Sequence, residues 1–248
     1  MARIIPLPLP PLPTPAHRDT PELLDALHAV PPATLAHNLR DIRRVNRYFG
    51  GTSVVLAHLP ALLTEQLQGS TVSVLDVATG SGDIPRALVR WGKRHGYDIR
   101  VVATDVADDV LTVARRETAD EARIVVEACD VRALPYHDDT FDIVTCSLAL
   151  HHLARADAVR ALTEMRRVAR YGVIVNDLVR SWSGYIGAWL LGALTTTNHL
   201  TRHDAPLSVL RAWTADELRA MATDAGMRGV TITPHPFCRQ ALVSDLSV

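Results

Sequence analysis

The sequence predicts an α/β protein built on a mostly parallel β-sheet with helices on both faces. From Val72 onward, short apolar segments rich in β-branched residues alternate with longer segments of helical periodicity. This alternation is typical of β-α-β units, in which a helix connects two parallel strands. The 248 residues, 48% of them hydrophobic, suffice for one α/β domain with a full core and a small lid.

The individual elements follow from this alternation. Strands are expected at 72–77, 100–104, 124–128, 141–146, 172–176, 230–233 and 240–243. Helices are expected between them at 84–95, 108–119, 155–170 and 214–225. The last helix opens with Thr214 three residues before Glu217, which is the spacing of a capping box.

The chain before this region divides into two parts. Residues 1–19 are broken by prolines, which predicts an extended, disordered tail rather than the continuous apolar core of a signal peptide. Residues 20–70 contain a short segment of helical pattern opened by Thr20, an arginine-rich one that ends at two glycines, and an apolar one. We expect these to form a helical lid on a main domain at 71–248.

Charge and cysteine content restrict the class of protein. The formal net charge is −1, so no general field attracts nucleic acid, and no nucleic-acid partner is expected. The three cysteines form no CxxC pair, which is typical of free thiols in a reducing compartment. The sequence therefore predicts a cytoplasmic protein.

A glycine loop follows the first expected strand, in the stretch VLDVATGSGDIP at 74–85. Gly80 and Gly82 occupy the first two positions of a dinucleotide fingerprint, but Pro85 stands where the last glycine belongs. Proline offers no N–H to a phosphate, and the carboxylate of Asp83 would repel one. A Walker loop is excluded because no Gly-Lys-Ser/Thr is present. The loop is therefore suited to a nucleoside without phosphates.

The acidic residues that follow the strands indicate which nucleoside this is. Asp76 at the end of the first strand, with loop carbonyls, suits an ammonium group, and Asp105 at the end of the second suits two ribose hydroxyls. Asp130 follows the third strand, where an adenine amine would lie, and Val131 can pack on the ring. An ammonium group, two ribose hydroxyls and an adenine amine are all present in S-adenosylmethionine. Loss of its methyl group gives S-adenosylhomocysteine.

From about Val72 to Ser247, the sequence resembles the class I S-adenosylmethionine-dependent methyltransferases. The motifs DVATGSGD, ATDVADDVLTVAR, CDVRALPYHDDTFDIVTCSLALHHL and WTADELRAMATDAGM occur in the family's order. The first motif looks most like that of the ubiquinone/menaquinone biosynthesis methyltransferases, which also have an aspartate at the position of Asp83. The resemblance implies a Rossmann-like, doubly wound seven-stranded sheet whose last strand is antiparallel. It also implies cofactor contacts from Asp76, Ala78, Thr79, Gly80, Gly82, Asp105, Val106, Asp130, Val131, Ser147 and, by a looser match, Arg47.

Histidines near the expected crevice are the candidates for chemistry. His151 and His152 follow the fourth strand, at the edge where α/β sheets bind ligands. A phenol or ring-carbon nucleophile needs a nearby base, a role that suits histidine. The alternative is that the pair is a solvated or capping helix start. Further substrate candidates are Asn176, Asp177, His199 and His203. A metal pair at the last two is conceivable, but no metal is expected.

The sequence leaves the roles of two segments open. The apolar insert at 181–206 contains several glycines, Thr195–Thr197 and Pro206, which argue against a long stable helix. It is interpreted as a lid, as a peripheral membrane patch at 182–194, or as a homodimer contact. No stretch is long enough to span a membrane. The arginine-rich segment at 40–47 is a solvated helix face, a lid or an RNA contact.

The sequence therefore predicts methyl transfer from S-adenosylmethionine (EC 2.1.1) to a small, largely apolar acceptor. A phenolic, quinol or polyketide-like compound fits best, modified at a hydroxyl or a ring carbon. The alternatives are an RNA or protein methyltransferase and a cofactor-binding subunit without catalysis.

Overall fold

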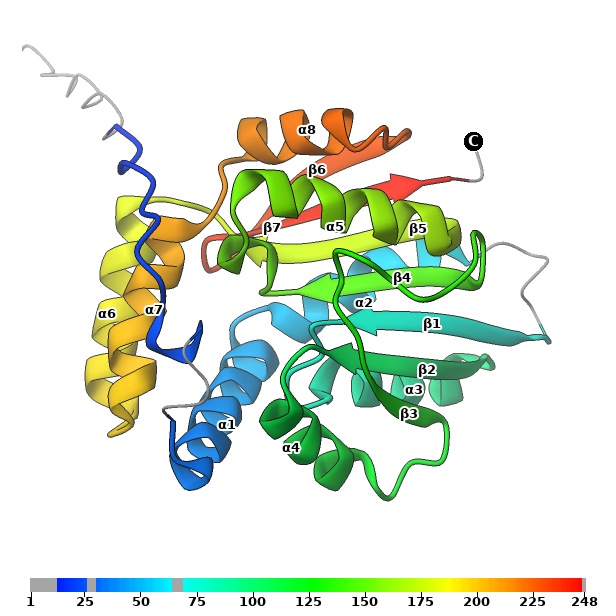
Figure 1. The fold of residues 1–248 in the computed structure, drawn as a ribbon, viewed down its shortest axis with the longest axis horizontal. Helices are drawn as coiled ribbons and strands as arrows, with labels where there is room; N and C mark the ends of the chain where they lie inside the picture. The colour runs from blue at the N-terminus through cyan, green and yellow to red at the C-terminus, as the bar shows by residue number, and fades with distance from the viewer. Residues whose placement is uncertain (1–12, 26–29, 64–68, 247–248) are drawn as a thin grey trace, which may run out of the picture.

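The molecule is built on a seven-stranded sheet with helices on both faces (Figure 1). The computed structural model describes residues 13–25, 30–63 and 69–246. The strand order is β3-β2-β1-β4-β5-β7-β6. The strands are β1 (Thr71–Val77), β2 (Asp98–Asp105), β3 (Ile124–Ala128), β4 (Phe141–Ser147), β5 (Ala169–Leu178), β6 (Val230–His235) and β7 (Arg239–Asp245).

The first five strands are parallel, and β7 is antiparallel to both β5 and β6. The seven expected strands and the antiparallel last strand are thereby confirmed. The carboxyl ends of β1, β2 and β4 meet at one edge of the sheet (left in Figure 1). Parallel α/β sheets place their ligands at this edge.

Helices cover the sheet and both sides of its carboxyl edge. They are α1 (Pro32–Tyr48), α2 (Gly51–Leu62), α3 (Asp83–His95), α4 (Asp108–Thr118), α5 (Arg155–Val168), α6 (Trp182–Thr195), α7 (His199–Arg211) and α8 (Ala215–Asp224), with a 3-10 turn, η3, at Leu150–His152. The expected helices after β1, β2, β4 and β5 are confirmed within a few residues. The capping box of Thr214 and Glu217 is present, with both of its hydrogen bonds.

Two apolar clusters hold these layers together. On one face, Leu162 and Met165 of α5 and Leu218 of α8 pack with Val144 and Val173 of the central strands. On the other, residues of α2 and α3 pack with the remaining strand side chains, including Val74 and Ile174. Because successive strand residues point to opposite faces, strands that are apolar throughout fill both clusters.

The N-terminal region is ordered further toward its start than the sequence predicts. Residues 13–25 run beside α7, where the Arg18 N–H donates to the carbonyl of Leu210 (3.1 Å) and Arg180 donates to that of Pro15 (3.0 Å). The prediction of a disordered tail at 1–19 is therefore wrong for 13–19, because backbone groups of this stretch find partners on the domain. Residues 1–12 lie outside the described residues.

The insert at 181–206 lies in two separate helices rather than one long helix, and its glycines do not prevent α6 from forming. Ser181 caps α6 by accepting from Gly184 N, and Asn198 caps α7, so the three threonines separate two helices. Gly184 allows close packing, because a Cβ there would lie 3.1 Å from both Cys238 Cβ and Val209 Cγ1. Within the described part of the chain, every helix is too short or too polar to cross a bilayer.

Candidate active site

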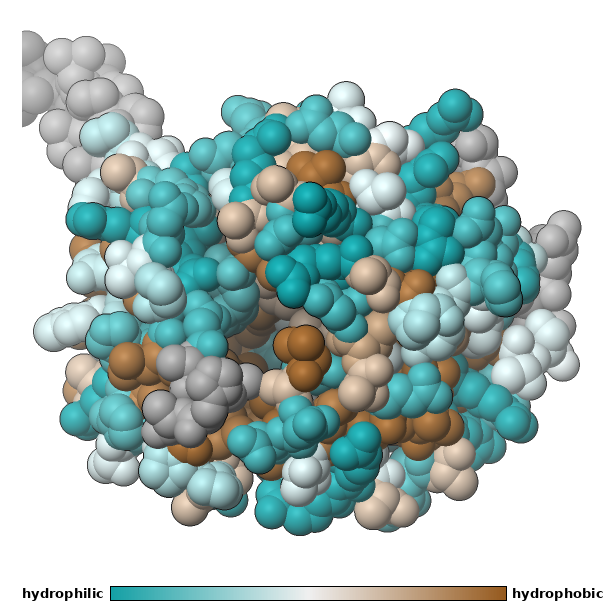
Figure 2. Space-filling model, in the orientation of Figure 1, coloured by the Kyte–Doolittle hydropathy of each residue, from teal (hydrophilic) through white to brown (hydrophobic). Residues whose placement is uncertain are grey.

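The loop between β1 and α3 combines left-handed backbone with open space. Gly80 and Gly82 have φ of 57° and 73°, a conformation that glycine adopts without strain. A Cβ at Gly82 would collide with Thr118 Cγ2 at 2.7 Å, so this glycine is required by packing. A Cβ at Gly80 would meet nothing closer than Leu39 Cδ2, at 4.0 Å. Gly80 therefore borders free space above the strand ends, and Figure 2 shows a hollow in this face.

Asp105 lies beside this loop at the end of β2. Its carboxylate accepts N–H bonds from Gly80 (3.1 Å) and Ala107 (3.3 Å). Burial raises the pKa of Asp105, although these backbone donors oppose the shift. The next side chain, Val106, is 70% exposed. The structure thus places a carboxylate and an exposed apolar side chain together beside Gly80.

Asp76 lies deeper, at the end of β1. It is buried, and the hydroxyl of Thr145 on β4 donates to its carboxylate at 2.6 Å. Burial raises the pKa of Asp76 to about 7. At the end of β4, the buried Ser147 hydroxyl has no hydrogen-bond partner among the described residues. Such an orphaned polar atom requires a partner that the protein itself does not supply.

Among the other residues predicted to contact the cofactor, Asp130 and Arg47 contact other side chains of the protein. Ala78 and Thr79 lie in the same loop, and Val131 follows β3. The Asp130 carboxylate is engaged by Arg132, with Nη2 at 2.7 Å. The Arg47 guanidinium lies over the ring of Tyr48, 5.4 Å from its centroid, and lines a groove between α1 and α3. Its neighbour Asn46 instead reaches the loop by donating to Asp83 (3.1 Å).

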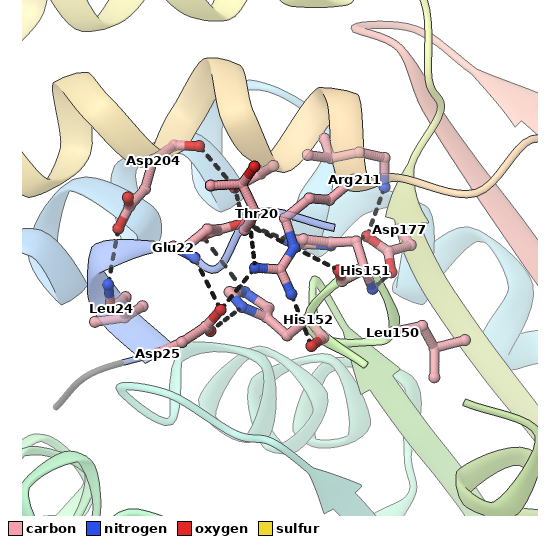
Figure 3. A network of polar contacts seen from close by, with 12 residues as sticks. Thr20, Glu22, Leu24, Asp25, Leu150, His151, His152, Asp177, Asp204 and Arg211 are labelled. Carbon is pink, nitrogen blue, oxygen red and sulfur yellow. Dashed lines mark hydrogen bonds and ion pairs between the residues drawn. The ribbon is translucent and has the colours of Figure 1, made fainter. Parts of the chain in front are cut away.

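The two consecutive histidines lie in η3, beside the carboxyl end of β4, and each is held by a carboxylate (Figure 3). Nδ1 of His151 lies 2.6 Å from Oδ1 of Asp177, and Nδ1 of His152 lies 2.8 Å from Oδ1 of Asp25. Because an ionised carboxylate only accepts, Nδ1 is the donor in both pairs. The two rings contact each other, with centroids 4.4 Å apart.

The ends of these rings face Glu22, which comes from the N-terminal segment. Nε2 of His151 lies 3.9 Å from Oε1 of Glu22, and Nε2 of His152 lies 3.8 Å from Oε2. Glu22 and His151 are each only 4% exposed. Burial raises the pKa of Glu22 to about 7, against opposing contributions from His152 and Ser208. The three side chains converge from segments more than 120 residues apart.

The groups around the histidine pair lower the pKa values of the two carboxyl groups that support it, Asp25 and Asp177. Burial acts to raise the pKa of Asp25, but hydrogen bonds from His152 and Arg211 outweigh it, and the pKa lies below its usual value. Burial also acts to raise the pKa of Asp177, but the attraction and hydrogen bond of His151, together with the hydrogen bond from the N–H of Leu178, lower it below its usual value. Both carboxylates are therefore ionised at neutral pH.

Helix α7 fixes the N-terminal segment over the histidines. Arg211 donates to the backbone carbonyls of His151 (3.0 Å) and His152 (2.8 Å) and to Asp25 (2.6 Å). Asp204 accepts from the N–H groups of Leu23 (2.9 Å) and Leu24 (3.0 Å). Helix α7, the histidine loop and the segment at 13–25 thus form one hydrogen-bonded unit.

The remaining substrate candidates divide between two places. Asp177 joins the histidines, but the preceding Asn176 points to the other face of the sheet, where it contacts Gly51 O (3.4 Å) and Arg239 (3.4 Å). His199 and His203 are exposed on α7, and the latter contacts Asp204 at 2.8 Å. Among the predicted substrate residues, only Asp177 lies in the cluster.

Comparison with known proteins agrees with this geometry. Residues 74–172 match the family model described as "Methyltransferase domain". The chain is 36% identical over 112 residues to the ubiquinone/menaquinone biosynthesis C-methyltransferase UbiE of Cupriavidus pinatubonensis, covering 44% of each chain. It is 35% identical over 138 residues to the UbiE protein of Chromobacterium violaceum, covering 53% of this chain and 54% of the relative. The alignments thus span about half the length of these relatives.

The solved structures agree in fold. A methyltransferase from Aquifex aeolicus, described as SAM-dependent, superposes with a TM-score of 0.59 at 19% identity, over 87% of this chain and 98% of its own. Over residues 74–172 the chain is thus similar to methyltransferases in sequence, and over most of its length it has their fold. A further structure of this fold, described as "PigF with SAH", superposes with a TM-score of 0.59 at 17% identity. These likenesses agree with the cofactor that the sequence predicts, S-adenosylmethionine.

The carboxyl edge of the sheet fits S-adenosylmethionine. The space at Gly80 admits a ligand beside the backbone, the Asp105 carboxylate suits two hydroxyl donors, and the unpartnered Ser147 hydroxyl lies at the adjacent strand end. The Asp130 carboxylate is less available to an adenine amine, because Arg132 already donates a hydrogen bond to it.

Four residues of the site were missed by sequence reasoning: Glu22, Asp25, Asp204 and Arg211. The signal for the first two was weak, since the segment of Glu22 and Asp25 has only the pattern of a short helix. Asp204 and Arg211 lie seven residues apart in the same helix, so they share a face. That spacing was available, but nothing in the sequence indicates that this face contacts the histidines.

Proposed function

We propose that this protein transfers a methyl group from S-adenosylmethionine to a hydroxyl oxygen or ring carbon of a small, largely apolar phenolic, quinol or polyketide-like acceptor. The nucleophile attacks the methyl carbon in line, the carbon–sulfur bond breaks, and its electron pair remains on sulfur in S-adenosylhomocysteine. The acceptor loses one proton. Positioning supplies most of the rate of such a transfer, and removal of the proton requires a group near the acceptor.

The observation that carries the proposal is the His151–Asp177 pair. The Asp177 carboxylate accepts a hydrogen bond from Nδ1–H, which favours the tautomer of the neutral imidazole whose Nε2 has a free lone pair. The pair lies where β4 and β5 end, beside the cofactor edge. His151 and His152 are assigned to promote the loss of the acceptor's proton. Asp177 positions His151, and the other predicted residues, Asn176, His199 and His203, are not needed for this step.

An apolar acceptor is supported by helix α6. Its exposed side chains include Ile186 (51%), Trp189 (54%), Leu190 (45%) and Leu194 (80%), and the whole helix carries no charged residue. Interfacial helices bury apolar and tryptophan side chains in the head-group region of a bilayer. The proposal therefore includes peripheral membrane contact through 182–194 by an enzyme of the cytoplasm, where its three free cysteines are stable.

The proposal is tested by transfer of a labelled methyl group to a panel of phenols, resorcinols and quinols. Wild type is compared with His151→Ala and with His203→Ala, which removes an exposed histidine of α7. We expect labelled product with wild type and with His203→Ala, and a large loss with His151→Ala at unchanged cofactor affinity. Equal turnover by all three proteins would remove His151 from the mechanism, and cofactor binding without transfer to any acceptor would contradict the proposal.

A second candidate function, RNA methylation, rests on one groove. A depression of about 1080 Å³ between α1 and α3 is lined by several arginines, among them Arg40, Arg47, Arg90 and Arg94. Four others at this groove are paired: Arg43 and Arg116 with Glu117, Arg44 with Asp41, and Arg86 with Asp120. RNA binding here would weaken steeply with salt. Absence of gel retardation at low salt would end this alternative.

A further inference from the structure

We infer that Glu22, His151 and His152 form a binding site for one divalent transition-metal ion of the zinc type. One ligand atom from each side chain, a ring nitrogen of each histidine and a carboxylate oxygen, lies within 4.8 Å of the others. Zinc binds imidazole nitrogen and carboxylate oxygen at about 2.0–2.2 Å. Inward movement of each side chain by a fraction of an ångström therefore brings all three to a common ion.

The arrangement of protons supports a cation at the centre. Each Nδ1 donates to a carboxylate, so Nε2 is the ring nitrogen whose lone pair is available to a metal ion. These two acceptors face a third, the Glu22 carboxylate, at 3.9 and 3.8 Å. Such distances are too long for hydrogen bonds. Three groups that can act as metal ligands thus converge without hydrogen bonds between them, and a metal ion would complete this arrangement.

The outer contacts are those of a metal site. Histidines that bind metal usually donate their second ring nitrogen to a carboxylate or carbonyl, which fixes the ring and its tautomer. Asp177 does this for His151 and Asp25 for His152. Ser208 donates to Oε1 of Glu22 at 2.8 Å and orients the third ligand. All three ligands are therefore held from outside.

The charge balance also favours a cation. Three carboxyl groups, from Glu22, Asp25 and Asp177, surround the two imidazoles, and Arg211 approaches two of them. Its Nε lies 4.0 Å from Oε1 of Glu22, and its Nη1 lies 2.6 Å from Asp25. A divalent ion would add positive charge beside these carboxyl groups in a buried place, where isolated negative charges are costly.

The ligand set selects the class of metal. Two imidazoles and one carboxylate suit Zn²⁺, Co²⁺ or Fe²⁺ rather than Mg²⁺ or Ca²⁺, which prefer oxygen ligands. Three protein ligands leave a coordination position open, as in catalytic sites. The sequence predicted no metal and weighed only His199 and His203, which lie outside the cluster on the exposed side of α7.

The role of the ion rests on the proposed function. At its open coordination position, the ion would bind the acceptor's hydroxyl oxygen. This would lower the pKa of the hydroxyl group, so that its proton passes to water. Because Glu22 belongs to the N-terminal segment, the ion would also tie that segment to the main domain. Metal binding itself does not depend on the acceptor.

The test is metal binding by the full chain after treatment with a chelator. Co²⁺ is titrated and followed by its visible absorption, and Zn²⁺ is titrated by calorimetry. The variants are Glu22→Gln, which keeps the shape of the ligand, and His152→Ala, whose side chain is 26% exposed. His203→Ala is the matched control. Circular dichroism and thermal melting establish that each variant is folded.

We expect one equivalent bound by wild type and by His203→Ala, and binding at least about tenfold weaker in Glu22→Gln and His152→Ala. No binding by folded wild type, or equal affinity in Glu22→Gln, would overturn the inference. Metal-free protein that methylates at the full rate, with loss in His151→Ala, would overturn the role of the ion and leave the proposed function intact. Failure to bind S-adenosylmethionine would contradict the proposed function without touching the metal site.

Discussion

Nδ1 of His151 and Oδ1 of Asp177 lie 2.6 Å apart, and both side chains are almost fully buried. The pair joins the loop after β4 to the end of β5, two neighbouring parallel strands. A second bond runs from the His151 N–H to the same carboxylate, at 3.2 Å. Asp177 therefore fixes the position of both the ring and the backbone of His151.

Asp177→Asn is expected to lower kcat by roughly 10²–10⁴-fold, the range for a misplaced proton-transfer group. Asparagine can present an N–H to Nδ1, which favours the wrong tautomer of the imidazole. Steady-state kinetics with an active acceptor measures the effect. Calorimetry should give unchanged affinity for S-adenosylmethionine, and a wild-type kcat in the folded variant would contradict the assignment.

Asp105→Ala is expected to weaken S-adenosylmethionine binding by at least about tenfold, because hydrogen bonds to a charged group contribute about 1.5–3 kcal/mol each. Asp108→Ala is the matched control, since it removes the same charge from an exposed position of α4. Calorimetric titration with S-adenosylmethionine and S-adenosylhomocysteine measures the affinity of each variant. Equal affinity in both variants would place the ribose elsewhere.

The two loop glycines should respond differently to alanine. Both have positive φ, so each substitution costs about 1–2 kcal/mol in backbone strain. Gly82→Ala adds a collision with Thr118 and should lower the melting temperature more. Gly80→Ala directs its methyl into open space and should mainly weaken cofactor binding. Thermal melting with and without cofactor separates the two effects, and a reversed order would contradict the location of the cofactor.

Cofactor affinity should increase with pH around neutrality. Burial raises the pKa of Asp76 to about 7, whereas a bound ammonium favours the ionised carboxylate, so binding releases a proton. Affinity then rises by up to about tenfold per pH unit below that pKa and levels off above it. Calorimetry in buffers of different ionisation enthalpy counts the protons. Asp76→Asn should be independent of pH, and a slope retained in this variant would assign the proton to another group.

The same group should affect the stability of the free protein in the opposite direction. A folded pKa raised above the unfolded value means that the folded state binds more protons in between. The contribution of Asp76 is therefore fully present below its unfolded pKa of about 3.9, and it declines as pH rises toward 7. Urea unfolding of wild type and Asp76→Asn across this range measures the difference.

Trp189→Glu combined with Leu194→Glu is expected to abolish sedimentation with phospholipid vesicles. Each apolar side chain contributes about 1.5–3 kcal/mol when it leaves water, so the loss should exceed tenfold. Val125→Glu is the control, because it changes a 53% exposed apolar residue on β3. A wild type that ignores vesicles and forms a dimer sensitive to the double variant would assign the α6 face to a second copy.

Local sequence patterns predicted the elements and the cofactor edge well. The seven strands, the helices between them and the loop of Gly80 and Gly82 agree with the structure because periodicity and glycine preference act over a few residues. The insert was the exception: the caps at Ser181 and Asn198 and the packing of α6 on α7 outweighed the glycines.

The sequence by itself determined the α/β class, the cofactor edge and the presence of a histidine pair beside it. Only the tertiary structure decided what faces those histidines. Asp25 lies 127 positions from His152 in the sequence, and Asn176 and Asp177 point to opposite faces although they are adjacent. Local preferences carry no information about such pairs, because long-range contacts form only when the packed sheet and α7 bring the N-terminal segment against the loop after β4.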